Sequence, residues 1–104
     1  MRKIATIKKV GTDVVRLMLY DTSSGVYLFL YQSIEDGPSS ADHWFESLEL
    51  AARSAAEDYG VTESDWQTIP DPAPGCQDDW ISPTRLRRDA TGQPIRGEFE
   101  PVQI

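Results

Sequence analysis

Two apolar seven-residue segments joined by a short polar loop constrain the fold of this chain more than any other feature. Residues 14–20 read Val-Val-Arg-Leu-Met-Leu-Tyr, and residues 26–32 read Val-Tyr-Leu-Phe-Leu-Tyr-Gln. The loop between them ends at Gly25 and has the length that usually includes a glycine at positive φ. The sequence therefore predicts an antiparallel β-hairpin.

Both faces of this hairpin are apolar, because side chains alternate between the two faces of a strand. One face carries the aliphatic residues Val15, Leu17, Leu19, Val26, Leu28 and Leu30. The other carries Met18, Tyr20, Tyr27, Phe29 and Tyr31. A sheet that is apolar on both faces is usually covered on both. A helix can cover one face, and we expect either the C-terminal segment or a second subunit to cover the other.

The rest of the chain predicts a single α+β domain over residues 1–104, with a three-strand antiparallel meander in 1–34. Residues 3–10 are the predicted first strand, placed at a sheet edge because Lys8 and Lys9 discourage further pairing.

One long amphipathic helix is predicted in 39–60, capped by Ser39 or Ser40 and followed by Gly60. Its apolar stripe consists of Trp44, Leu48, Ala51, Ala55 and Tyr59. After it, residues 61–83 predict a proline-rich loop, opened by a capping box at Thr62–Asp65. Residues 84–104 predict one or two short strands or a tail.

Cysteine usage and hydropathy narrow the class of protein. Cys76 is the only cysteine, so an intrachain disulfide is excluded and a reducing cytoplasm is favoured. No segment has the apolar length of a signal peptide or a membrane span, so we expect a soluble cytoplasmic protein. The chain also lacks a Cys/His cluster, which removes structural zinc.

Charge is distributed unevenly along the chain, whose net charge is −7. Residues 35–79 carry twelve acidic groups against Arg53 alone. This field disfavours nucleic acid and favours a basic protein partner. We therefore expect a non-enzymatic protein-interaction module, a monomer or weak homodimer, that uses an acidic helix–loop surface. The residues predicted for that surface are Glu46, Glu49, Glu57, Trp66, Asp78, Asp79 and Trp80.

No catalytic, cofactor or metal signature stands out. Cys76 and His43 are the only thiol–imidazole pair, and they leave open a small cysteine-dependent enzyme. The acidic residues near Cys76 oppose that alternative, since negative charge raises a thiol pKa. The acids from Asp65 to Asp79 do not have the spacing of an EF-hand calcium loop.

Two features of the C-terminal half have structural explanations that we favour over functional ones. Arg85, Arg87 and Arg88 form a basic cluster, which we expect to compensate Glu57 and Asp58 at the end of the helix. The two tryptophans that flank the proline-rich loop are expected to hold it on the aromatic sheet face.

The segment Pro70-Asp71-Pro72-Ala73-Pro74-Gly75-Cys76-Gln77-Asp78-Asp79-Trp80 resembles one found in a group of short uncharacterised bacterial proteins, and the similarity extends over nearly the whole chain. It implies a bacterial origin and a shared fold, but no activity. Part of the segment is similar to a Pro-Asp-Leu-Pro-Gly-Cys element of HicB-like antitoxins, which also have a three-strand meander and a helix. There the element precedes the helix, whereas here it follows it. An antitoxin-like regulator and a self-associating structural protein are the remaining alternatives.

Overall fold

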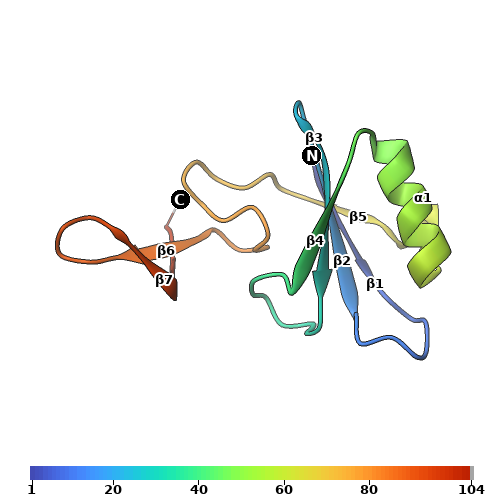
Figure 1. Cartoon of the computed structure of the whole chain (residues 1–104), viewed down its shortest axis with the longest axis horizontal. Coiled ribbons are helices and arrows are strands. Elements are labelled where there is room, and N and C mark those ends of the chain that lie inside the picture. Colours follow the sequence, from blue (N-terminus) through green and yellow to red (C-terminus); the bar gives the residue numbers. More distant parts are fainter. Residues whose placement is uncertain (104) are drawn as a thin grey trace.

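One antiparallel sheet of five strands forms the body of the protein, and a separate two-stranded sheet extends from it (Figure 1). The computed structural model describes residues 1–103, so the last residue of the predicted segment 84–104 lies outside the described residues. The strand order in the body is β4-β3-β2-β1-β5. In chain order the elements are β1 (Arg2–Thr6), β2 (Arg16–Thr22), β3 (Gly25–Tyr31), β4 (Ala41–Phe45), α1 (Leu48–Tyr59), the 3-10 helix η1 (Glu63–Asp65), β5 (Gln67–Ile69), β6 (Thr84–Arg88) and β7 (Pro94–Pro101).

The predicted α+β class is confirmed, but the sheet is larger than the predicted three-strand meander. β1, β2 and β3 do pair in sequence as antiparallel neighbours. The prediction that the first strand lies at an edge is wrong, because β1 is paired with β2 on one side and with β5 on the other. Lys8 and Lys9 follow β1 in an exposed loop and therefore protect no edge.

The hairpin between β2 and β3 forms as predicted, with Leu19 opposite Leu28. Gly25 has φ +124° and begins β3. A Cβ at Gly25 would overlap the indole of Trp44, which lies against the turn. Only glycine meets both demands, because other residues rarely adopt this φ and all of them carry a Cβ.

The helix is shorter than predicted, since it spans Leu48–Tyr59 and not 39–60. Its N-cap is Ser47, whose side chain accepts a hydrogen bond from the backbone N–H three residues further on. Ser39 and Ser40, the predicted caps, lie upstream in the connection that leads into β4.

Residues 41–45, expected to be the first turns of the helix, form β4 and pair with β3. Trp44 fits the helical spacing of the apolar stripe, but aromatic residues also favour strands. Pairing with β3 provides hydrogen-bond partners for the backbone of this segment, so the tertiary contact decides between the two patterns.

α1 covers the aliphatic face of the sheet, as the sequence predicted. Ala51 and Ala55 are fully buried, and their small side chains let the helix approach the strands closely. The helix ends at Gly60, which has φ +69°. The buried residues of this core are Ala5, Leu17, Leu19, Val26, Leu28, Leu30, Ala51, Ala55 and Val61. No helix within residues 1–103 is long and apolar enough to span a membrane.

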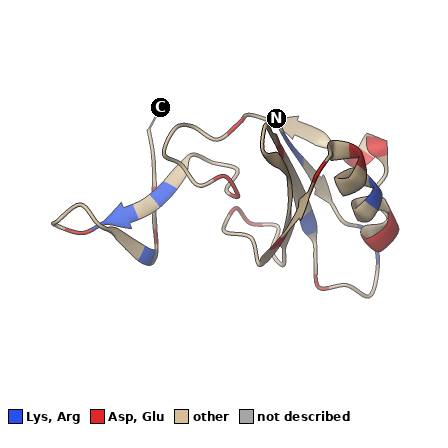
Figure 2. Ribbon diagram, turned by 45° about the horizontal axis from the view of Figure 1, so that its top comes forward, with Lys and Arg blue, Asp and Glu red and all other residues tan. Residues whose placement is uncertain are grey.

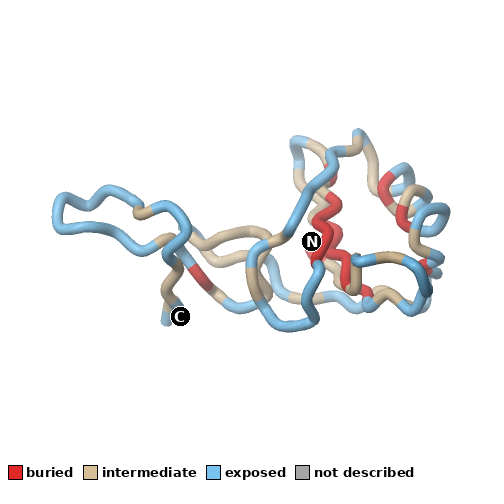
Figure 3. The backbone as a smooth tube through the Cα atoms, turned by 60° about the horizontal axis from the view of Figure 1, so that its bottom comes forward, coloured by how far each residue is buried: buried red, intermediate tan, exposed pale blue. Residues whose placement is uncertain are grey.

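The chain's own C-terminal half covers part of the aromatic face, which was one of the two covers predicted. Met18, Phe29 and Tyr31 are buried there, with Ile69 and Ile81 packed against them. Figure 3 shows the buried residues concentrated in the central strands. A second core therefore forms on the face that α1 does not reach.

The hairpin of β6 and β7, residues 84–101, extends away from the body and is called the arm below (Figure 1). The molecule measures 46 × 30 × 21 Å, and Figure 3 shows that most residues of the arm are exposed. Trp80 packs against Phe99, with ring centroids 5.0 Å apart, where the arm leaves the body.

The predicted compensation of the helix end by the arginine cluster is wrong. Arg85, Arg87 and Arg88 lie on the arm, which extends away from α1 (Figures 1 and 2). Arg85 instead pairs with Glu100 across the arm, at 2.8 Å between Nε and Oε1. This pairing is local because antiparallel neighbours place the two side chains opposite each other.

Candidate functional site

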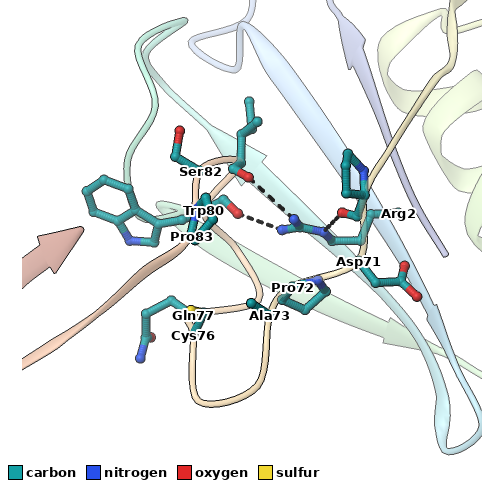
Figure 4. Close-up of a pocket in the computed structure, with 11 residues that line it drawn as sticks. Arg2, Asp71, Pro72, Ala73, Cys76, Gln77, Trp80, Ser82 and Pro83 are labelled. Carbon is teal, nitrogen blue, oxygen red and sulfur yellow. Dashed lines mark hydrogen bonds between the residues drawn. The ribbon is translucent and has the colours of Figure 1, made fainter. Parts of the chain in front are cut away.

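A buried arginine holds the proline-rich loop on the aromatic face (Figure 4). Arg2 is only 2% exposed. Its Nε donates to the carbonyl of Pro70 at 2.8 Å, and Nη1 donates to those of Asp78, at 3.0 Å, and Trp80. Nη2 reaches the carbonyl of Ile81 at 3.4 Å. The guanidinium is thus occupied by loop carbonyls, so the small cavity of about 170 Å³ beside it is not a free anion site.

Two aspartates complete the attachment of this loop. Asp79 accepts hydrogen bonds from the backbone N–H and the hydroxyl of Ser39, at 2.9 and 3.0 Å. Asp36 accepts from the backbone N–H groups of Ile81 and Ser82, both at 2.8 Å. Burial alone would raise the pKa of Asp36, but these hydrogen bonds hold it below the ordinary value. Asp79, predicted as part of a binding surface, therefore has a structural role.

Asp78 lies beside this attachment and adds negative charge to the same face. Burial raises the pKa of its carboxyl, and the charges of Asp79 and Asp42 raise it further, while Arg2 lowers it. Because Asp79 is hydrogen-bonded to Ser39, two residues before β4 begins, the loop brings its acids close to this edge of the sheet.

A row of three aromatic residues crosses the uncovered part of the same face. Trp44 on β4 is opposite Tyr27 on β3, and Tyr27 is opposite Tyr20 on β2. Trp44 is 52% exposed, and both tyrosines are partly exposed. Tyr27 is also stacked on Phe29, with centroids 5.9 Å apart. We call Trp44, Tyr27 and Tyr20 the aromatic row.

β4 is the outermost strand beside this row and presents a free edge. Its outward-facing backbone groups have no strand partner among residues 1–103. β4 has five residues and contains neither lysine nor proline. The opposite edge, β5, has only three residues and is followed at once by Pro70. Short strands and prolines protect an edge against further pairing, and β5 has both. β4 has neither, and Asp42 is its one acidic residue.

The predicted surface residues do not form one surface. Glu46 precedes α1, and Glu49 and Glu57 lie on it, on the aliphatic side of the sheet. Glu49 is paired with Arg53 at 3.2 Å, as the i,i+4 spacing predicts. The loop residues Asp78, Asp79 and Trp80 belong to the opposite side.

The two predicted tryptophans also separate. Trp66 packs against the aliphatic core beside Val61, which contradicts the expectation that it holds the loop on the aromatic face. Trp80 stays with the loop, and its carbonyl accepts from Arg2. Sequence reasoning placed Tyr20 and Tyr27 on the aromatic face but missed that Asp42 and Trp44 lie beside them. The two-residue spacing of Asp42 and Trp44 indicates a strand. The four-residue spacing of Trp44 and Leu48 favoured a helix instead.

Cys76 and His43 lie on opposite sides of the sheet. His43 is opposite Leu28 and so belongs to the aliphatic face, whereas Cys76 lies in the loop over the aromatic face. A thiol–imidazole pair needs direct contact, which this arrangement does not provide. No group of three or more metal-ligating side chains comes together within the described part of the chain.

A groove of about 570 Å³ runs between α1 and the connection to β5. Its walls are mainly apolar, and its charged residues offset one another, since Lys3 lies with Glu63 and Glu49 is paired with Arg53. Charge therefore selects no occupant for this groove. The lining residues are Lys3, Leu19, Leu48, Glu49, Ala52, Ala56, Val61, Thr62, Glu63 and Trp66.

The edge of β4 and the aromatic row are exposed features that combine several kinds of binding group. Free backbone groups, aromatic rings and the Asp42 carboxylate lie within one part of the sheet. The chain was also compared with protein-family models, with curated proteins and with solved structures, and none of the three comparisons found a match.

Proposed function

We propose that this chain is a non-enzymatic protein-interaction module that binds an extended basic segment of another protein along β4. The observation that carries the proposal is an unprotected five-residue edge strand with Asp42 and Trp44 on one face. An extended peptide that adds to such an edge gains affinity from main-chain hydrogen bonds and specificity from alternate side chains.

The charge of the surroundings supports a basic partner. Residues 1–83 carry fourteen acidic and six basic side chains, a net charge of −8. Figure 2 shows most of the acidic residues on the body. A field of this sign attracts and orients a cationic segment before contact.

The side chains on β4 define where the positive charges of the partner should lie. Asp42 and Trp44 are two residues apart and point to the same face. A lysine or arginine opposite Asp42 forms an ion pair, and one opposite Trp44 lies against the indole as a cation–π contact. The preferred segment therefore has basic residues at every second position.

The test uses a labelled peptide of alternating lysine and valine, with a glutamate–valine peptide as the charge-reversed probe. Fluorescence anisotropy should show binding of the basic peptide only. Asp42→Asn should weaken that binding about threefold, because it removes one cross-strand ion pair. Trp44→Ala should weaken it about fivefold, because it removes the cation–π contact and apolar area.

Asp13→Asn is the matched control, because it removes an exposed acid from the loop before β2. Neutralising Glu46, Glu49 and Glu57 together tests the helix surface that the sequence favoured. Equal binding of both peptides, or full affinity in Asp42→Asn and Trp44→Ala, would refute the β4 site. Loss of binding in the triple variant alone would place the site on α1.

A further inference from the structure

The arm presents a cationic strand edge away from the body. β6 is one of only two strands in its sheet, so one of its edges faces no other strand among the described residues. Arg85 is paired with Glu100, and Arg88 donates to the carbonyl of Gly92. Arg87 is exposed and has no ion pair within residues 1–103.

The free edge of β6 is regular, although the arm contains a bulge. Leu86 is opposite Phe99, and Arg88 is opposite Pro94. β7 therefore has four residues between these two pairs where β6 has one. The irregularity belongs to β7, where Gly97 has φ +80°, and it leaves the spacing along β6 intact.

Two-stranded hairpins are marginally stable in water when nothing packs on them. Beyond its own pairing, the arm is joined to the preceding loop by the Trp80–Phe99 contact and by two hydrogen bonds at Thr84, of 2.6 and 3.0 Å. The carbonyl of Thr84 accepts from the N–H of Gln77, and its hydroxyl donates to the carbonyl of Ser82. An arm held so lightly gains stability from a strand that pairs with its free edge.

We propose that β6 of a second copy of this chain pairs antiparallel with β4, in a β-sheet contact that rests on the proposed function of the β4 edge. Both strands have five residues, so their full lengths match. In this register Arg87 lies opposite Asp42, and Arg85 lies opposite Trp44. The contact thus places Arg87 against the carboxylate of Asp42, and Arg85, which is also paired with Glu100, against the indole of Trp44.

The arm must come from another copy, because within one chain it extends away from β4 (Figure 1). Charge explains why a copy of this chain is a suitable partner. The body carries a net charge of −8, whereas β6 carries three arginines and no acid, and the arm as a whole has a net charge of +1. Each copy therefore supplies both an acidic strand edge and a basic strand edge, at equal concentrations.

The experiment measures the mass of the purified full chain by light scattering after size exclusion, from micromolar to millimolar concentration. We expect the mean mass to rise with concentration. Arg87→Glu should weaken association about tenfold, because a favourable cross-strand pair becomes a repulsive one. Asp42→Arg should do the same, and circular dichroism would show that both variants remain folded.

Charge exchange makes the test specific to this contact. The double variant Asp42→Arg/Arg87→Glu should associate again, because the same two positions carry opposite charges in reversed order. Arg96→Glu, on β7, is the matched control and should associate as the wild type does. A constant monomer mass, an unaffected Arg87→Glu variant, or a double variant that stays monomeric would overturn the proposal.

Failure of this inference can be separated from failure of the proposed function. If the chain stays monomeric but the lysine–valine peptide binds at β4, the self-pairing proposal is wrong and the module proposal stands. If the peptide also fails to bind, both are wrong.

Discussion

Replacing Arg2 with methionine should detach the proline-rich loop from the sheet. The guanidinium of Arg2 donates hydrogen bonds to four backbone carbonyls in residues 70–81, and Arg2 itself is only 2% exposed. A hydrogen bond from a charged donor contributes about 1.5–3 kcal/mol net. The two bonds at 2.8 and 3.0 Å, to Pro70 and Asp78, would together give about 3–6 kcal/mol on this scale. Because the released loop regains water, we expect a loss of about 3–4 kcal/mol of unfolding free energy.

Urea unfolding followed by tryptophan fluorescence measures this loss. Arg2→Lys should lose about half as much, because lysine keeps the charge but lacks the planar fork that reaches several carbonyls. Arg53→Met is the matched control, since it removes an exposed arginine and only one surface ion pair. It should cost about 0.3–0.5 kcal/mol. If Arg2→Met unfolds at the same urea concentration as this control, the assigned role of Arg2 is wrong.

Two further predictions test the loop attachment and the start of the helix. Hydrogen bonds hold the folded-state pKa of Asp36 below the ordinary value of 3.8. The ionised carboxylate therefore stabilises the fold above pH 3.8, and this stabilisation is lost as the pH falls through the folded-state pKa. The difference in unfolding free energy between wild type and Asp36→Asn should therefore be full at neutral pH and shrink in acid; a difference that grows in acid would contradict it. Ser47→Ala should lower the unfolding free energy by about 1 kcal/mol, and Ser40→Ala by much less, because only Ser47 caps α1. Equal losses in a thermal melt would place the helix start upstream.

The hairpin and the helix end could be predicted because their determinants are local. Gly25 and the alternation on either side of it define the β2–β3 turn within a few residues of sequence. Gly60 likewise ends α1 through its own left-handed conformation. Neither feature depends on contacts with distant parts of the chain.

β4 was mistaken for helix because one tryptophan satisfies two patterns. Trp44 lies four residues before Leu48, which fits a helical stripe, and two residues after Asp42, which fits a strand. The local sequence favours neither, and the pairing of β4 with β3 settles the choice. β5 was missed for a related reason, since three residues are too few to show alternation.

The role of Arg2 had no signal in the sequence at all. Its nearest and farthest loop partners, Pro70 and Ile81, are 68 and 79 residues away along the chain. A charged residue is normally expected in solvent. Its burial follows only once β1 lies inside the sheet, between β2 and β5, with the loop folded across it.

The rule that edge strands carry protective residues led to the wrong prediction of the sheet edges, and the observed edges bear on function. Lysines were taken to mark an edge at β1, yet the real edges are β4 and β5. Edges that must not pair with another strand are protected, and β5 is protected by its length of three residues and by Pro70. An edge without such protection, next to Asp42 and Trp44, exposes the protein to aggregation unless a specific strand covers it. The unprotected edge therefore argues for an occupant of β4, and the opposite charges of β4 and β6 argue that this occupant is basic.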